Sequence, residues 1–166
     1  NGLAAMTLMG SWEIGYFSNA QHKWRPGQDF DFFPFPAIDP GLAKVALGPI
    51  DGLVMPRKAP NPAGARAAMA FLADIEAQQA ISRGSGALAP NTQVPRTFYG
   101  DLQLRIRDEI ESSPHFAFNY DLATAPDVAE LGLGAFSEFL AFPTAYPKIL
   151  ARLQDDAAKA RARRQP

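Results

Sequence analysis

Apolar side chains recur at three- and four-residue steps from residue 61 onward, which is the spacing of one face of an α-helix. The first such stretch begins at Asn61, a residue type that caps helices, directly before Pro62, and it ends at Gly84 and Gly86. Its stripe consists of Ala65, Ala68, Met69, Leu72, Ile75 and Gln79. We therefore predict a helix over residues 61–83.

The same spacing predicts three more helices. They cover residues 98–113, 126–142 and a segment that starts at Tyr146 and frays past Ala160. The aromatic segment 115–123, which precedes the second of them, shows no regular period and is expected to be irregular.

Short apolar runs in the first third of the chain are typical of strands. We predict a buried strand over residues 4–9 and an edge strand over residues 29–36, which prolines stop. Between them, Ser11 is expected to cap a short helix that reaches about Ala20. Two further runs, 45–47 and 53–55, flank a glycine-bounded turn where the backbone must bend or approach something closely. The chain is thus expected to be α/β and helix-rich, with a few short strands.

Composition narrows the function classes. The 166 residues (18.0 kDa) are 47% hydrophobic and 20% charged, which is typical of a globular protein. A formal net charge of −1 gives no general attraction for nucleic acid. Cysteine is absent, which excludes thiol chemistry, and no run of about 18 apolar residues predicts a membrane span. Because the chain begins at Asn1, we expect a piece of a longer protein.

Catalytic and metal-binding motifs are weak. The two histidines, His22 and His115, lie far apart, and the sequence has neither a nucleophile elbow nor a phosphate-binding glycine loop. We therefore expect neither a cofactor nor a metal. Several aspartates could form a general acid and base pair, but solvated surface acids are the commoner case. These are Asp29, Asp31, Asp51, Asp121 and Asp127.

Two aromatic residues stand beside hydrogen-bonding side chains where the chain changes direction. They are Trp12, between Ser11 and Glu13, and Tyr120, between Asn119 and Asp121. A sugar ring offers an apolar face to an aromatic ring and hydroxyl groups to polar neighbours, so both segments suit carbohydrate binding. Core packing is the more common role of such a tryptophan, and spacing alone leaves both roles open.

Four segments in order resemble the second half of the family 1 extracellular solute-binding proteins of sugar ABC transporters, the maltose-binding-like group. They are Gly2 to Trp12, Phe32 to Pro36, Gly48 to Gly52, and the Ala-rich helix that Asn61-Pro62 opens. Residues 119–140 are similar to the closing segment of that family.

The resemblance implies a non-catalytic receptor in which two α/β lobes of a type II periplasmic-binding-protein fold close on a carbohydrate and dock on a membrane permease. By the family pattern Trp12 stacks on the sugar, Asp51 and Gly52 lie where the chain crosses between lobes, and Tyr120 lies at the cleft edge. Ser11, Glu13 and Asp121 are weaker candidates for the same binding site. No cofactor is implied, and the location is periplasmic or extracellular, in a free or a lipid-anchored form.

The resemblance also divides the chain. Residues 1–52 and 91–166 would belong to the carboxy-terminal lobe, and residues 53–90 would join the other lobe. Because most of that other lobe would lie upstream, the apolar stripe of the 61–83 helix would lack its cover, and we expect the isolated chain to bind sugar poorly and to self-associate. Two alternatives remain open at this point, a carbohydrate-active hydrolase fragment and a helical interaction module without a small ligand.

Overall fold

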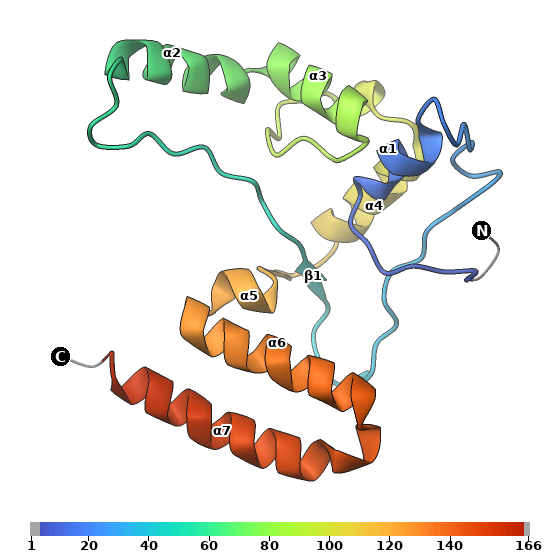
Figure 1. Cartoon of the computed structure of the whole chain (residues 1–166). Helices are drawn as coiled ribbons and strands as arrows, with labels where there is room; N and C mark the ends of the chain where they lie inside the picture. Colours follow the sequence, from blue (N-terminus) through green and yellow to red (C-terminus); the bar gives the residue numbers. More distant parts are fainter. Residues whose placement is uncertain (1–3, 165–166) are drawn as a thin grey trace. The chain divides into compact units, whose positions relative to one another are not determined.

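The computed structural model describes residues 4–164, which form a helix-rich chain with two short strands (Figure 1). The strands are β1 (Val45–Leu47) and β2 (His115–Ala117). The α-helices are α1 (Glu13–Ser18), α2 (Pro62–Ala73), α3 (Ile75–Ser85), α4 (Asp101–Glu111), α5 (Tyr120–Ala123), α6 (Pro126–Ala141) and α7 (Tyr146–Ala162). Two 3-10 turns, Arg96–Phe98 and Pro143–Ala145, precede α4 and α7.

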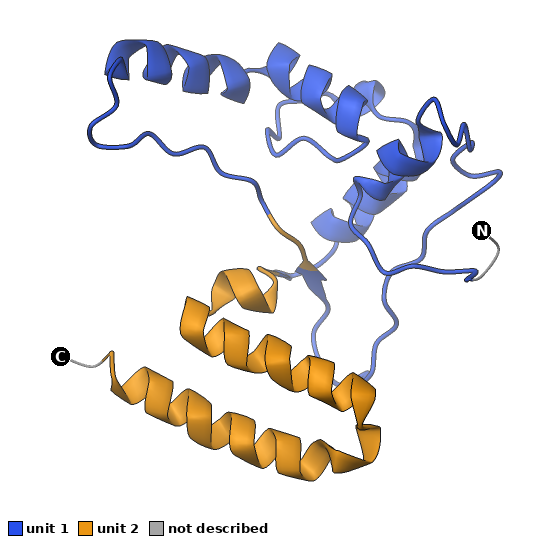
Figure 2. Ribbon diagram, viewed as in Figure 1, with its two compact units in different colours: residues 1–46, 50–116 blue, residues 47–49, 117–166 orange. Residues whose placement is uncertain are grey.

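The chain divides into two compact units (Figure 2). Unit 1 comprises residues 1–46 and 50–116, and unit 2 comprises residues 47–49 and 117–166. The chain passes from one unit to the other at β1 and β2, which pair in parallel as a two-stranded sheet. The α/β, helix-rich character expected from the sequence is therefore present. The division into lobes at residues 52 and 90 concerns the intact protein and stays a prediction.

Unit 1 has a small core that the segment between α3 and α4 helps to close. Its buried residues include Ala77 and Ser82 of α3, Val94 and Tyr99 of the connecting segment, and Leu102 of α4. The Tyr99 hydroxyl accepts a hydrogen bond from the backbone N–H of Ala89 (3.2 Å). Arg107 of α4 donates to the carbonyl of Val94 (3.2 Å), so this segment also contacts α4 although it has little regular structure of its own.

Unit 2 is built on an antiparallel pair of helices, α6 and α7, with α5 against the beginning of α6. Val128 packs with Ala157 and Ala160 of α7, and Leu131 extends this cluster. Small alanine side chains let the two helix backbones approach closely, which gives the pair a core despite its small size.

The predicted helices form, with one break. Asn61 caps α2 by accepting a hydrogen bond from the N–H of Gly64 (2.9 Å), and Gly86 ends α3 in the left-handed conformation with φ 76°. The continuous helix over 61–83 is wrong, however, because Asp74 leaves the helical conformation and caps α3 through the N–H of Ile75 (2.7 Å). An aspartate favours such a cap over a helix interior.

Both predicted strands at the amino-terminal end are wrong. Residues 4–9 and 31–36 have no strand structure, and the 29–36 segment contributes only a single bridge, between Pro26 and Phe30. Apolar side chains of the first segment are exposed, Leu8 to 80%. A strand needs a neighbour to receive its hydrogen bonds, and within residues 4–164 the only sheet pairs β1 with β2. The apolar run 53–55 is likewise irregular.

Candidate functional site

The first turn of α1 presents the residues that the sequence singled out most strongly. Two backbone hydrogen bonds form a turn before the helix. The N–H of Glu13 donates to the carbonyl of Gly10 (3.1 Å), and the N–H of Ile14 donates to the carbonyl of Ser11 (3.2 Å). Trp12 occupies the capping position, with helical backbone angles and no side-chain cap. The prediction that Ser11 caps this helix is wrong, because its side chain is engaged elsewhere.

The Trp12 indole lies over the backbone of Gly10. A Cβ at Gly10 would overlap the six-membered part of the indole, so only glycine allows this position of the ring. The residue nevertheless remains 39% exposed. The Trp12 ring is therefore partly exposed and has a defined position over Gly10. It is not a core residue enclosed by aliphatic groups.

The hydroxyl of Ser11 accepts a long hydrogen bond from the backbone N–H of Leu88 (3.4 Å). This contact attaches the segment after α3 to the start of α1. Glu13, the first residue of α1, is half-buried beside it. Ser11 and Glu13 thus stay next to Trp12, as their positions in the chain require.

Two glycines fix α1 against the end of α3. A Cβ at Gly15 would overlap the carbonyl of Ser85, and a Cβ at Gly86 would overlap the backbone of Gly15. A shallow concavity opens beside this contact, between α1, α3 and α4. It is lined by Ile14, Gly15, Ser18, Ser82, Arg83, Gly86, Phe98 and Gln103, and Trp12 is not part of its lining.

An aromatic cluster follows Trp12 directly, and the sequence analysis did not predict it. Phe17 stacks on Trp24 (ring centroids 4.9 Å apart, 22° between planes) and also contacts Phe30 (5.1 Å). Tyr16 contacts His22 at 4.8 Å. The excess of aromatic residues on both sides of this loop is the signal that could have revealed the cluster.

An ion pair closes the same loop. Both the backbone N–H and the side chain of Arg25 donate to the carboxylate of Asp29 (2.8 and 3.0 Å). The hydrogen bond from the guanidinium is the main reason that the pKa of Asp29 is lowered. Asp31 pairs with Arg105 of α4, and that hydrogen bond likewise lowers the pKa of Asp31. These two aspartates are therefore engaged by arginines and not by each other.

Asp51 and Gly52 lie in the irregular chain between β1 and α2, and both are exposed. A Cβ at Gly52 would meet nothing within 4 Å. The sequence predicted that the backbone of this turn comes close to another group. At Gly52, no described residue makes such an approach. A binding role of the two residues stays a prediction.

Tyr120 belongs to unit 2, where it joins α5 to α6. Its hydroxyl donates to the carbonyl of Val128 (2.9 Å), and its ring rests on Gly132, where a Cβ would overlap it. Tyr120 remains 42% exposed, and Asp121 is exposed beside it. The structure thus gives Tyr120 a packing role, while its contact with a solute stays a prediction.

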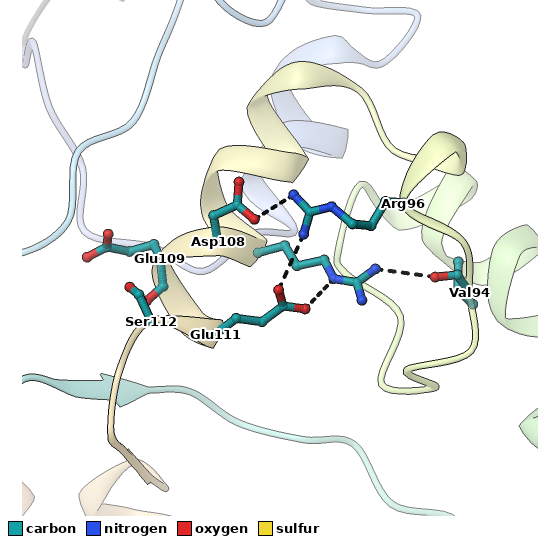
Figure 3. Close-up of polar contacts among 7 residues, drawn as sticks. Val94, Arg96, Asp108, Glu109, Glu111 and Ser112 are labelled. Atoms are coloured by element: carbon teal, nitrogen blue, oxygen red, sulfur yellow. Dashed lines mark hydrogen bonds and ion pairs between the residues drawn. The ribbon is translucent and has the colours of Figure 1, made fainter.

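A network of ion pairs lies on α4 and the segment before it (Figure 3). Arg96 donates to Asp108 (2.6 Å) and Glu111 (3.3 Å), and Glu111 also accepts from Arg107 (2.6 Å). Arg107 also donates to the carbonyl of buried Val94 (3.2 Å), and its pairing with Glu111 raises its pKa. The four-residue step from Arg107 to Glu111 could have indicated part of this network. Since each carboxylate has an arginine partner, the network fastens the segment before α4 and is not a free binding surface.

No three His, Asp or Glu side chains among residues 4–164 are grouped so that they could hold a metal ion. No helix in that range has the length and hydropathy needed to cross a membrane.

Comparison with known proteins identifies the class to which this region belongs. Residues 1–79 match the family described as bacterial extracellular solute-binding protein, and over these residues the chain is a member of that family. This confirms the family predicted from the sequence. Because the family consists of binding components of transporters and not of enzymes, it favours the receptor over the hydrolase alternative.

A curated relative supports the same assignment. The chain is 35% identical over 112 residues to an uncharacterized ABC transporter extracellular-binding protein of Pyrococcus horikoshii. The matched region is 68% of this chain and 24% of the relative, so the chain spans about a quarter of the relative's length. No solved structure is significantly similar to the chain.

Proposed function

We propose that this chain is part of the solute-binding component of an ABC importer and that the solute is a sugar or an oligosaccharide. The family match and the Pyrococcus relative support the transporter class. The partly exposed Trp12 indole, held over Gly10 at the start of α1, is the observation that carries the sugar assignment. A flat ring whose rotamer is already restricted can stack on a pyranose with little further loss of side-chain conformational entropy.

The remaining parts of the proposal follow from the family. Ser11, Glu13, Asp51, Gly52, Tyr120 and Asp121 are the other proposed solute-contacting residues. The partner in the membrane is an ABC transporter permease, and the protein works outside the cytoplasm, in the periplasm or anchored by lipid at the cell surface. No cofactor takes part, because ring stacking and polar contacts to hydroxyl groups suffice for reversible binding.

The two tryptophans allow a direct test of the binding role of Trp12. In a Trp24→Phe variant, Trp12 is the only tryptophan, so its emission reports on its own surroundings. We expect a panel of mono- and oligosaccharides to include one that shifts or quenches this emission in a saturable way. The matched Trp12→Phe variant, in which Trp24 reports, should show no such change. Equal responses in both variants would contradict the proposed site.

Calorimetry then measures the contribution of the ring. For the sugar found in the fluorescence screen, Trp12→Ala is expected to weaken binding by about tenfold or more, because stacking on an aromatic ring is worth on the order of 1 kcal/mol beyond the area it buries. Trp24→Ala serves as the control, since Trp24 is similarly exposed (45%) but belongs to the neighbouring aromatic cluster. An unchanged affinity in Trp12→Ala would remove Trp12 from the site. No response to any sugar would favour the helical interaction module.

A further inference from the structure

The concavity between α1, α3 and α4 contains a single charged side chain. All three helices belong to unit 1, and the concavity has a volume of about 210 Å³. Arg83, in the last turn of α3, is the only charged residue of its lining, and the apolar part of the lining includes Ile14 and Phe98. Because no acidic side chain lines it, the concavity carries a positive charge.

Several arginines of unit 1 pair with a carboxylate, but Arg83 does not. The paired ones are Arg25, Arg96, Arg105 and Arg107. Among residues 4–164 no carboxylate pairs with Arg83, and its guanidinium lies over the Phe98 ring, 5.3 Å from the ring centroid. A cation–π contact restricts the side chain, but the N–H groups of the guanidinium can still donate hydrogen bonds. Arg83 therefore has a defined position and unused donors.

The other polar side chains of the concavity are largely engaged within the chain. The Ser82 hydroxyl donates to the carbonyl of Ala87 (2.5 Å), and the Gln103 amide donates to the carbonyl of Gly86 (2.9 Å). The Ser18 hydroxyl, at the end of α1, has no hydrogen-bond partner among the described residues. The groups left for a ligand are thus the Arg83 guanidinium and the Ser18 hydroxyl, and both can donate.

These groups favour a ligand with one negative charge. The concavity lies at the C-terminal end of α3, where Gly86 caps the helix. This end of a helix carries a partial negative charge, which disfavours a dianion such as a phosphate. A carboxylate has one charge and two acceptor oxygens, which match a single guanidinium. The neighbouring Phe98 ring suits the apolar face of a sugar.

We propose that the concavity binds one uronate unit of an acidic oligosaccharide, with the carboxylate on Arg83. This inference rests on the proposed sugar-binding function and adds the charge of the solute. The volume is below the roughly 300–1,000 Å³ of sites for drug-sized ligands, so it suits one sugar unit. Ile14 lies only two residues after Trp12, and Trp12 is not part of the lining. The indole therefore stacks on an adjacent unit of the same oligosaccharide.

Calorimetry on the 166-residue chain tests the charge preference directly. The probes are disaccharides of galacturonate, glucuronate and mannuronate, and each is compared with its uncharged methyl ester. We expect one of the acids to bind about tenfold more tightly than its ester at low salt, because its carboxylate accepts charge-assisted hydrogen bonds. The difference should shrink at high salt, since Arg83 is exposed.

Two variants assign the preference to a residue. Arg83→Gln should bind the acid and the ester equally, with the affinity for the ester unchanged, which a general loss of folding would not leave intact. The matched control is Arg66→Gln on α2, because Arg66 is also exposed and also has no carboxylate partner among residues 4–164. This variant should keep the full preference for the acid. Circular dichroism confirms that both variants fold.

The outcomes separate this inference from the proposed function. Equal affinities of every acid and its ester overturn the inference, while binding of a neutral sugar that depends on Trp12 leaves the proposed function intact. A preference that persists in Arg83→Gln also overturns it, as does tighter binding of a sugar phosphate than of any uronate. A preference that requires Arg83 but not Trp12 supports the concavity and contradicts stacking on the indole. No binding of any sugar contradicts both proposals.

Discussion

Trp12 and Tyr120 have the same sequence signature, an aromatic residue between polar neighbours, yet the two regions that hold them use the ring differently. Both rings lie over a glycine, Gly10 for Trp12 and Gly132 for Tyr120. The Tyr120 hydroxyl donates a hydrogen bond to the carbonyl of Val128, so this residue links α5 to α6. The Trp12 ring lies over Gly10, which is only two residues away in the chain. The same sequence signature therefore does not distinguish a ring that links two helices from a ring that lies over an adjacent residue of the chain.

The glycine under Tyr120 provides the largest expected effect. Gly132→Ala places a Cβ in the ring and should displace Tyr120 from Val128, which destabilises unit 2 by about 1–3 kcal/mol. Urea unfolding followed by circular dichroism measures the change. The control is Gly134→Ala in the same helix, where a Cβ meets nothing within 4 Å, and which should stabilise by up to about 1 kcal/mol because alanine favours helix. Equal effects of the two substitutions would refute a joining role of Tyr120.

Replacing Gly10, which lies under Trp12, should change the free energy of unfolding less than replacing Gly132 does. It should mainly change the position of the Trp12 indole. In a Trp24→Phe background, Gly10→Ala is expected to shift the emission of Trp12, because the new Cβ displaces the indole. The free energy of unfolding should change by less than about 1 kcal/mol. Gly52→Ala, at a position with open space, is the control and should change neither quantity. A stability loss as large as that of Gly132→Ala would mean that Trp12, like Tyr120, has a structural role.

Acid should produce the smallest change, confined to the loop that follows α1. The pKa of Asp29 is lowered in the folded chain by its hydrogen bond from Arg25, so this pair stabilises the loop above the unfolded pKa of about 4 and the effect is lost as pH falls through the lower folded pKa. In a Trp12→Phe background, the emission of the neighbouring Trp24 should change below about pH 4. Asp29→Asn should remove this change, and its persistence would contradict the assignment.

Two helix ends that depend only on near neighbours in the chain were predicted correctly, although the Ser11 cap and the unbroken helix across Asp74 were not. Asn61 begins α2 and Gly86 ends α3 as expected, because a cap needs only the adjacent turn. The strands over 4–9 and 29–36 were wrong because a strand depends on a partner that the local sequence does not contain. Within the candidate site, Trp12 could be selected from the sequence because its polar neighbours are adjacent in the chain. The contact of Tyr120 with Gly132 could not be predicted, since these residues lie on different helices.

The contact between Gly15 and Gly86 has a consequence for how the chain responds to cleavage. Together with the hydrogen bond between Ser11 and Leu88, it ties α1 to the end of α3, two segments that are far apart in the sequence. The irregular stretch before α2 lies between these two attachment points and is largely exposed. A protease that nicks this stretch therefore leaves two fragments that remain noncovalently joined at the glycines, and they should separate only when a denaturant is added.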